Sequence, residues 1–234
     1  MKADFALDYT VIAVERAQHV YLLARILAEA APQSAARRPL NLSVVLDRSG
    51  SMQGNKLSYI KQAAQYLVQR LAAQDRFSLV SYNQSVTVDV PPISALEKDR
   101  INHAIKKLES SGTTNLSGGW LQGCQLVAGG IAEGQVNRVL LLTDGLANEG
   151  VTDTARLEAL ARQKRSEGIT TTTMGVGMDF NEDLLMRMAK EAGGAFYFID
   201  NPDQAPNIFN EELNLMMSVV GQNLMITLIL TPEV

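Results

Sequence analysis

Short apolar runs alternate regularly with amphipathic stretches between residues 40 and 218. The runs at 42–46 and 139–142 are almost wholly apolar, which is typical of strands buried on both faces. The stretches between such runs repeat apolar residues at helical spacing, as at Leu57 and Ile60. This alternation predicts a Rossmann-like α/β fold, in which helices cover both faces of a mostly parallel sheet.

The same patterns place the individual elements. Core strands are expected at 42–46, 77–82, 139–142, 169–176 and 196–199. An edge strand is expected from about Val86, ending at Pro91 and Pro92 because proline cannot donate to a ladder. Helices are expected at about 57–71, 101–108, 117–132 and 152–167, from 181 onward, and at 202–218. Ligands of such folds bind beyond the carboxyl ends of the strands.

The two ends of the chain differ from this central domain at 40–218. Apolar and polar residues alternate at 3–9 and 20–26, and again at 224–230, which predicts strands. Prolines interrupt the stretch before residue 40 and indicate a linker. Segments 1–38 and 220–234 are therefore expected to pair as a small antiparallel β appendage that flanks the domain.

Composition sets aside several classes of function. The formal net charge is −4 and no basic stripe is present, so nucleic acid is not an expected partner. No apolar run has the length of a signal-peptide core or of a membrane-spanning helix, so a cytoplasmic protein without membrane insertion is expected. The single cysteine, Cys124, is interpreted as a small buried apolar residue in a reducing compartment.

Acidic and hydroxyl side chains follow two of the predicted strands. Asp47, Ser49 and Ser51 stand at alternate positions after the first core strand, so their oxygens can point at one centre. Gly50 lets the backbone bend closely around that centre. Asp144 follows a second apolar strand. Oxygen ligands suit a hard cation, with Mg²⁺ expected and Mn²⁺ or Ca²⁺ as alternatives.

A further hydroxyl is available in the loop at 112–116. Thr113 and Thr114 each carry one there. Serine and aspartate before a helix are also ordinary N-caps, which is the competing interpretation of the turn that begins at Asp47. The presence of Thr114 and Asp144 in the same chain favours a metal site over capping alone.

These residues carry a family resemblance. Asp47-x-Ser49-x-Ser51, Thr114 and Asp144 match, in order and context, the metal-ion-dependent adhesion site of von Willebrand factor type A domains. The chain resembles bacterial members of that family and those related to inter-α-trypsin inhibitor heavy chains, where β structure also flanks the domain. The resemblance implies that the five residues serve one divalent cation, some directly and some through water, with Thr113 as the alternative to Thr114. It also implies that an acidic residue of a partner protein completes the coordination.

Two more residues are candidates for the rim of this site, where a partner would touch it. Arg48 is the variable position inside the motif. Trp120 is a candidate ligand contact, with packing in the core as the alternative. Glu211 and Glu212 are interpreted as a solvated helix face.

The charge of the site favours binding over catalysis. Two carboxylates formally balance one divalent ion, which can still attract an anion from a partner. Neither His19 nor His103 lies near the serines in sequence, so no nucleophile and base pair is indicated. We therefore expect a metal-dependent protein-binding module that is not an enzyme, in which the last helix could couple ligand binding to the flanking sheet.

Two other classes of function compete with this one. The first is a regulatory or assembly subunit of an ATP-driven complex, whose AAA+ ATPase must be a separate chain because no phosphate-binding P-loop is present. The second is a hydrolase or phosphatase that uses Asp47, which is disfavoured because a haloacid-dehalogenase-type enzyme needs an aspartate where Ser49 stands.

Overall fold

The computed structural model describes residues 2–9, 19–27, 37–145, 147–177, 180–201, 204–218 and 226–229. The chain divides into two compact units. One comprises Met1–Arg37 with Val220–Gln222, and the other comprises Arg38–Val219 with Asn223–Val234. Within the described ranges, no helix combines the length and the apolar character needed to cross a membrane.

The smaller unit contains a two-stranded antiparallel sheet. β1 (Lys2–Leu7) pairs with β2 (Leu22–Leu27), so that Lys2 faces Leu27 and Leu7 faces Leu22. The expected β appendage is therefore present in the N-terminal segment. In the C-terminal segment, residues 226–229 have no regular secondary structure, and the rest of the strand expected at 224–230 lies outside the described residues. Its pairing with the N-terminal segment stays a prediction.

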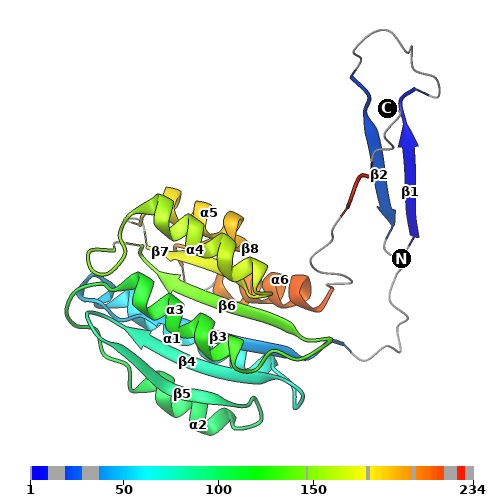
Figure 1. Cartoon of the computed structure of the whole chain (residues 1–234). Coiled ribbons are helices and arrows are strands. Elements are labelled where there is room, and N and C mark those ends of the chain that lie inside the picture. Colours follow the sequence, from blue (N-terminus) through cyan, green and yellow to red (C-terminus); the bar gives the residue numbers. More distant parts are fainter. Residues whose placement is uncertain are drawn as a thin grey trace. The chain divides into compact units, whose positions relative to one another are not determined.

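The larger unit is built on a six-stranded sheet in the order β5-β4-β3-β6-β7-β8 (Figure 1). Its strands are β3 (Leu40–Asp47), β4 (Arg76–Tyr82), β5 (Val86–Ser94), β6 (Val136–Thr143), β7 (Thr170–Val176) and β8 (Gly193–Ile199). All neighbouring pairs are parallel except β4 with β5. The mostly parallel sheet predicted from the apolar runs is confirmed.

Helices cover both faces of this sheet. They are α1 (Asn55–Arg70), α2 (Lys98–Lys106), α3 (Leu116–Ala128), α4 (Thr154–Ser166), α5 (Glu182–Glu191) and α6 (Ala205–Met217), with a short 3₁₀ turn η1 (Gly50–Met52) before α1. Their buried side chains fall into two clusters: α1, α2 and α6 contribute to one, and α3, α4 and α5 to the other. The predicted order of strands and helices is confirmed.

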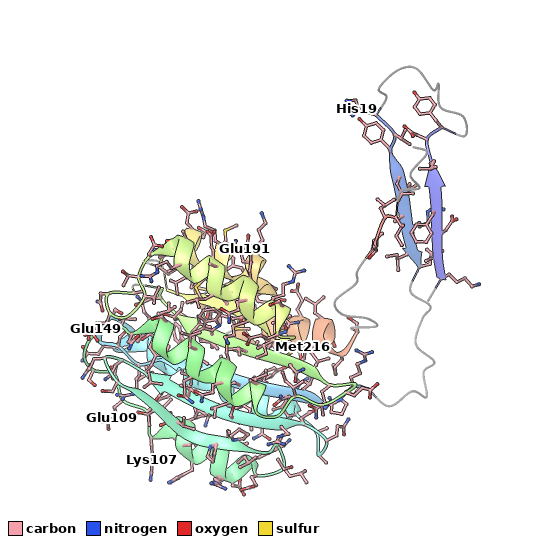
Figure 2. All side chains as sticks on the ribbon, in the orientation of Figure 1. His19, Lys107, Glu109, Glu149, Glu191 and Met216 are labelled. Atoms are coloured by element: carbon pink, nitrogen blue, oxygen red, sulfur yellow. The ribbon has the colours of Figure 1, made fainter. Side chains whose placement is uncertain are left out.

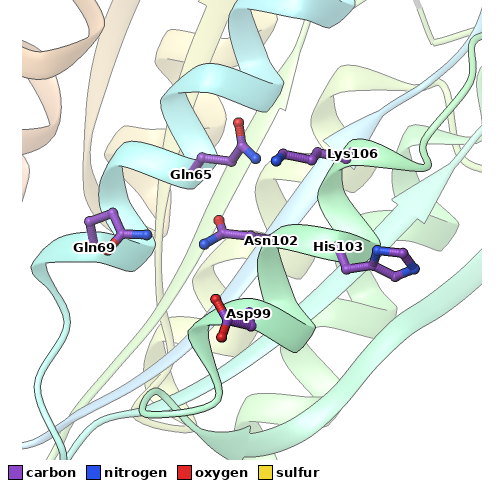
Figure 3. Close-up of a pocket in the computed structure, with 6 residues that line it drawn as sticks. All are labelled: Gln65, Gln69, Asp99, Asn102, His103 and Lys106. Atoms are coloured by element: carbon purple, nitrogen blue, oxygen red, sulfur yellow. The ribbon is translucent and has the colours of Figure 1, made fainter.

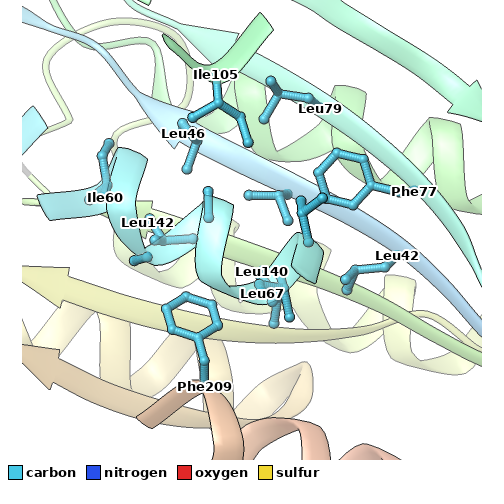
Figure 4. Close-up of a cluster of buried hydrophobic side chains, with 14 of the residues drawn as sticks. Leu42, Leu46, Ile60, Leu67, Phe77, Leu79, Ile105, Leu140, Leu142 and Phe209 are labelled. Atoms are coloured by element: carbon cyan, nitrogen blue, oxygen red, sulfur yellow. The ribbon is translucent and has the colours of Figure 1, made fainter. Parts of the chain in front are cut away.

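Alternation along the strands supplies both clusters. In β3, Val44 and Leu46 join the first cluster and Val45 joins the second, and all three are fully buried. Figure 4 shows the first cluster, in which Ile60 and Leu67 of α1, Ile105 of α2 and Phe209 of α6 gather with side chains of the strands. Burial on both faces explains the apolar runs at 42–46 and 139–142.

The edge strand differs from its prediction. β5 continues past Pro91 and Pro92 to Ser94. Its pairing with β4 is irregular in this stretch, because Leu79 faces Val90 and the next pair towards the strand end is Phe77 with Ile93. An edge strand can bulge around residues that lack a backbone donor, so the prolines interrupt the ladder without ending the strand.

The helix face assigned to Glu211 and Glu212 is solvated only in part. Glu211 is exposed, but Glu212 is fully buried. Its Oε1 lies 3.5 Å from Nη1 of Arg138 in β6 and accepts a 2.6 Å hydrogen bond from the Thr172 hydroxyl in β7. The solvated interpretation of Glu212 is wrong, because this side chain anchors α6 to the sheet.

The strand order creates a switch point at the centre of the sheet. From β3, α1 leads to β4 on one side, whereas β6 pairs on the other side. The connections after β3 and β6 therefore run to opposite faces of the sheet, through α1 and α4. Ligands of open α/β sheets bind at such a switch point.

Candidate metal centre

The two predicted carboxylates lie at this switch point. Asp47 is the last residue of β3, and Asp144 directly follows the last residue of β6. The two strands are parallel neighbours in which Leu46 faces Leu142, so both carboxylates reach the same edge of the sheet. Both residues are fully buried. Burial raises the pKa of the Asp47 carboxyl; hydrogen bonds from Ser49 and Thr143 oppose this rise, and the nearby charge of Asp144 adds to it.

Three donors hold the Asp47 carboxylate in place. Its Oδ1 accepts a 2.8 Å hydrogen bond from the backbone N–H of Ser49. Its Oδ2 accepts one from the Thr143 hydroxyl at 2.6 Å and one from the Tyr82 hydroxyl at 3.3 Å. The Thr143 hydroxyl in turn accepts from the backbone N–H of Gly145 at 2.8 Å. This network fixes the orientation of the carboxylate before any ligand arrives.

The serine hydroxyls of the turn are neighbours. Ser49 Oγ and Ser51 Oγ lie 3.1 Å apart, with Ser49 buried and Ser51 exposed. The 3₁₀ turn forms because Met52 N–H donates to Ser49 O at 3.0 Å, and the Met52 side chain is buried in the core. The alternation seen in the sequence therefore brings two hydroxyl oxygens to one place, beside the carboxylate of Asp47.

The loop that contains Thr114 is hydrogen-bonded to the same turn. Ser111 N–H donates to Arg48 O at 2.8 Å, and Gly50 N–H donates to Gly112 O at 2.9 Å. A Cβ on Gly50 would come within 3.1 Å of that carbonyl, so glycine permits the close approach. Thr114 itself is buried. The structure places it two residues beyond this contact, and its role as a ligand stays a prediction.

The loop that follows β6 holds Thr114 in place. The backbone N–H of Thr114 donates to Asn148 Oδ1 at 2.8 Å, and the carbonyl of Thr114 accepts from the N–H groups of Asn148 and Glu149 at 3.2 and 3.1 Å. The alternative residue, Thr113, is exposed and its hydroxyl donates to the Glu149 carboxylate. Glu149 and Glu109, which belong to these loops, lie at the same end of the sheet (Figure 2). These contacts favour Thr114 over Thr113.

Three residues at this site were not anticipated from the sequence. Thr143 and Tyr82 are the donors to Asp47, and Lys56 in α1 places Nζ 3.3 Å from Oδ2 of Asp144. Thr143 directly precedes Asp144, and a polar residue at the end of an apolar strand could have indicated that it belongs to the site. Lys56 lies outside the apolar stripe of its helix, and no periodicity distinguishes it from a solvated lysine.

Oxygen is the donor type at this edge. Among the described residues, no three or more histidine, cysteine, aspartate and glutamate side chains gather as a metal cluster. The candidate ligands are instead two carboxylates and neutral hydroxyls. Hydroxyl oxygens carry no charge, so the set suits a hard divalent cation and offers nothing that favours a softer metal.

The predicted position of Trp120 at the rim is wrong. Its side chain is fully buried and its Nε1 donates to the Thr171 hydroxyl at 3.0 Å. Trp120 lies one turn after Leu116 and one turn before Cys124, so all three share the helix stripe that packs on the sheet. Cys124 is fully buried in the same cluster, which confirms its interpretation as a small buried apolar residue, and this burial raises the pKa of its thiol to about 12.

Arg48, the other rim candidate, is half-buried, and its Nε donates to the Ser81 hydroxyl at 3.2 Å. It lines an open pocket of about 300 Å³ together with Asp89, Lys107 and Glu109. A larger pocket of about 460 Å³ lies between α1 and α2 (Figure 3), and none of its lining residues belongs to the predicted metal site. Contact of Arg48 with a partner stays a prediction.

Comparison with known proteins gives a family match. The family model of the von Willebrand factor type A domain matches residues 41–211. The uncharacterized protein YfbK of Escherichia coli K12 is 34% identical over 185 residues, covering 78% of this chain and 32% of YfbK. Inter-alpha-trypsin inhibitor heavy chain H4 of Bos taurus is 27% identical, covering 82% of this chain and 22% of the relative. This chain therefore spans less than half the length of either relative.

Solved structures share the fold. A von Willebrand factor type A protein from Catenulispora acidiphila aligns with a TM-score of 0.66 at 22% identity, covering 92% of this chain and 46% of that one. Proximal thread matrix protein 1 from the mussel byssus, described with a zinc-occupied MIDAS motif, aligns with a TM-score of 0.61 at 19% identity. That alignment covers 76% of this chain and 48% of the mussel protein.

Proposed function

Because the chain belongs to the von Willebrand factor type A domain family, we propose that Asp47, Ser49, Ser51, Thr114 and Asp144 hold one divalent cation that binds an acidic residue of a partner protein. The observation that carries this proposal is the pair of fully buried carboxylates at the ends of adjacent parallel strands. The zinc-occupied motif described for the mussel protein supports a cation at such a site.

The donors fit a hard cation on physical grounds. Asp47 and Asp144 are both fully buried, and the charge of Asp144 contributes to the raised pKa of Asp47. Two buried like charges are costly, and a divalent cation between them offsets that cost. Mg²⁺ is the proposed cofactor because the remaining donors are hydroxyls, with Mn²⁺ and Ca²⁺ as alternatives.

The partner is proposed to supply a carboxylate. When bound, the cation supplies an electrophilic centre that can accept one more oxygen ligand. Ser51 is exposed, so this edge of the site is open to a side chain from outside. The hydroxyls of Ser49 and Ser51 add no charge, which leaves an incoming aspartate or glutamate as the favoured anion.

Binding is proposed in preference to catalysis. The serine hydroxyls have each other as partners, and His103 lies on α2 in the pocket of Figure 3. In the part of the chain that the structure describes, no hydrogen bond joins a serine of this site to a histidine. A serine nucleophile would need such a base within hydrogen-bond reach.

The test is calorimetric titration of chelator-treated protein with Mg²⁺, Mn²⁺ and Ca²⁺. We expect saturable binding of about one ion per chain by the wild type, which Asp47→Asn and Asp144→Asn abolish. Asp99→Asn is the matched control, because this exposed acid in the first turn of α2 lies outside the site. Thermal unfolding in chelator checks that each variant folds.

Two outcomes would contradict the proposal. The wild type could show no saturable binding even with acetate present to complete the coordination. Alternatively, Asp47→Asn and Asp144→Asn could bind the ion as tightly as Asp99→Asn, which would place the cation elsewhere.

A further inference from the structure

Lys56 extends from α1 to the predicted metal site. It lies in the first turn of that helix, and its Nζ is 3.3 Å from Oδ2 of Asp144. The lysine side chain is 23% exposed, and the aspartate side chain is fully buried. This is a mostly buried contact, in which attraction is screened less by salt than in a surface ion pair.

The backbone beyond β7 leaves room for this lysine. Gly177 directly follows the strand, with a φ of 82° that favours glycine. A Cβ at this position would come within 2.5 Å of Cε of Lys56. The stem of Lys56 therefore packs against a position without a side chain, which directs its ammonium group to Asp144.

The ammonium group changes the charge of the site. Asp47, Asp144 and Lys56 have formal charges that sum to −1 (−1 −1 +1), and a divalent cation brings the sum to +1. Without the lysine, the loaded site would be neutral. A carboxylate from a partner therefore neutralises the loaded site only because Lys56 is present.

We propose that Lys56 is a specificity-determining residue of the metal site, whose ammonium group competes with the cation for Asp144 and attracts the carboxylate of the partner. This inference rests on the proposed function. The proposal predicts two opposite effects of the positive charge: it weakens the binding of a cation and strengthens the binding of an anion. A lysine that only supports the fold would weaken both, or neither.

The test measures both affinities in Lys56→Gln. Mg²⁺ affinity comes from calorimetry, and carboxylate affinity comes from titrating Mn²⁺-loaded protein with acetate and following water-proton relaxation. We expect Lys56→Gln to bind Mg²⁺ about three- to tenfold more tightly and acetate about three- to tenfold more weakly than the wild type.

Two further variants sharpen the result. Lys56→Arg keeps the charge and should keep the acetate affinity within about twofold of the wild type. Lys61→Gln is the matched control, because this lysine is on the same helix and its ammonium donates to the Lys106 carbonyl on α2. It should leave both affinities unchanged. Thermal unfolding in chelator confirms that the variants are folded.

The possible failures can be told apart. If the wild type binds Mg²⁺ and Lys56→Gln shows two unchanged affinities, or two that fall together, the role of Lys56 is overturned and the metal site stands. If the wild type binds none of the ions, the proposed function fails and this inference fails with it.

Discussion

The buried ion pair beneath α6 allows a quantitative test of how the last helix is held. Arg138 and Glu212 are 9% and 1% exposed in their side chains, with Nη1 and Oε1 3.5 Å apart. The Thr172 hydroxyl lies between them, accepting from Arg138 Nη1 at 3.0 Å and donating to Glu212 Oε1 at 2.6 Å. Among the described residues, Arg138 Nε and Glu212 Oε2 have no hydrogen-bond partner.

These contacts set the size of the effect. Arg138→Met removes the charge that balances Glu212, and loss of one partner from a buried pair costs about 3–5 kcal/mol. For a unit of this size each kcal/mol lowers the melting temperature by roughly 2–4 °C, so a fall of about 6–20 °C is expected. The double variant Arg138→Met/Glu212→Leu also removes both unpartnered atoms. It should be as stable as the wild type, or more stable by about 1–4 kcal/mol.

Urea unfolding of the wild type, Arg138→Met, Glu212→Leu and the double variant gives the four corners of a double-mutant cycle. Strong coupling between the two positions is the expected result. The reasoning is refuted if either single variant loses less than about 1 kcal/mol, or if the double variant loses the sum of the two single losses. Either result would mean that water reaches the pair, or that α6 is held by its apolar contacts alone.

Two predictions concern Asp47. Thr143→Val removes the 2.6 Å hydrogen bond to its carboxylate and should weaken Mg²⁺ binding about tenfold in calorimetry. Thr143→Ser keeps the hydroxyl and should bind Mg²⁺ as the wild type does; equal binding by the wild type and both variants would contradict an orienting role of Thr143. Burial raises the pKa of Asp47 in the folded state, so its contribution to the free energy of unfolding is largest below the unfolded pKa of about 4 and is lost as the pH rises through the folded pKa. Urea unfolding in chelator, measured from below the unfolded pKa to above the folded pKa, should therefore show a smaller loss of stability with rising pH in Asp47→Asn than in the wild type. Identical slopes of stability against pH in the two proteins would contradict the argument.

Much of the fold could be predicted because its signals are local. β3 and β6 are buried at every position, so their apolar runs and the helical spacing between them indicate a covered parallel sheet. The position of the candidate ligands could be predicted for a related reason. Asp47, Ser49 and Ser51 stand at alternate positions in one short segment after a predicted strand, and Asp144 directly follows another. The carboxyl ends of parallel strands meet at one edge of the sheet, so both carboxylates are expected there.

The misses depend on tertiary contacts that no local pattern encodes. Trp120 follows the loop at 112–115 in sequence, but it lies on the face of α3 that packs against the sheet, so its side chain is in the core. Glu212 is one residue from an exposed glutamate, and only packing against Arg138 shows that it is buried. Lys56 resembles any lysine at the start of a helix, and its reach to Asp144 depends on a glycine at position 177, far away in the chain.

The location of the two carboxylates supports the proposed cation site at this edge of the sheet. A strand that is buried on both faces ends in a region with little water: Asp47 is the last residue of β3, Asp144 directly follows β6, and both are fully buried. Low water content strengthens their mutual repulsion and, by the same factor, their attraction to a cation. The hydrogen bonds from Thr143 and Tyr82 hold Asp47 in position, so little ordering is left for the moment of binding. Metal binding at the proposed site therefore depends on the sheet as much as on the ligands, because the sheet keeps water away from the carboxylates and fixes their positions.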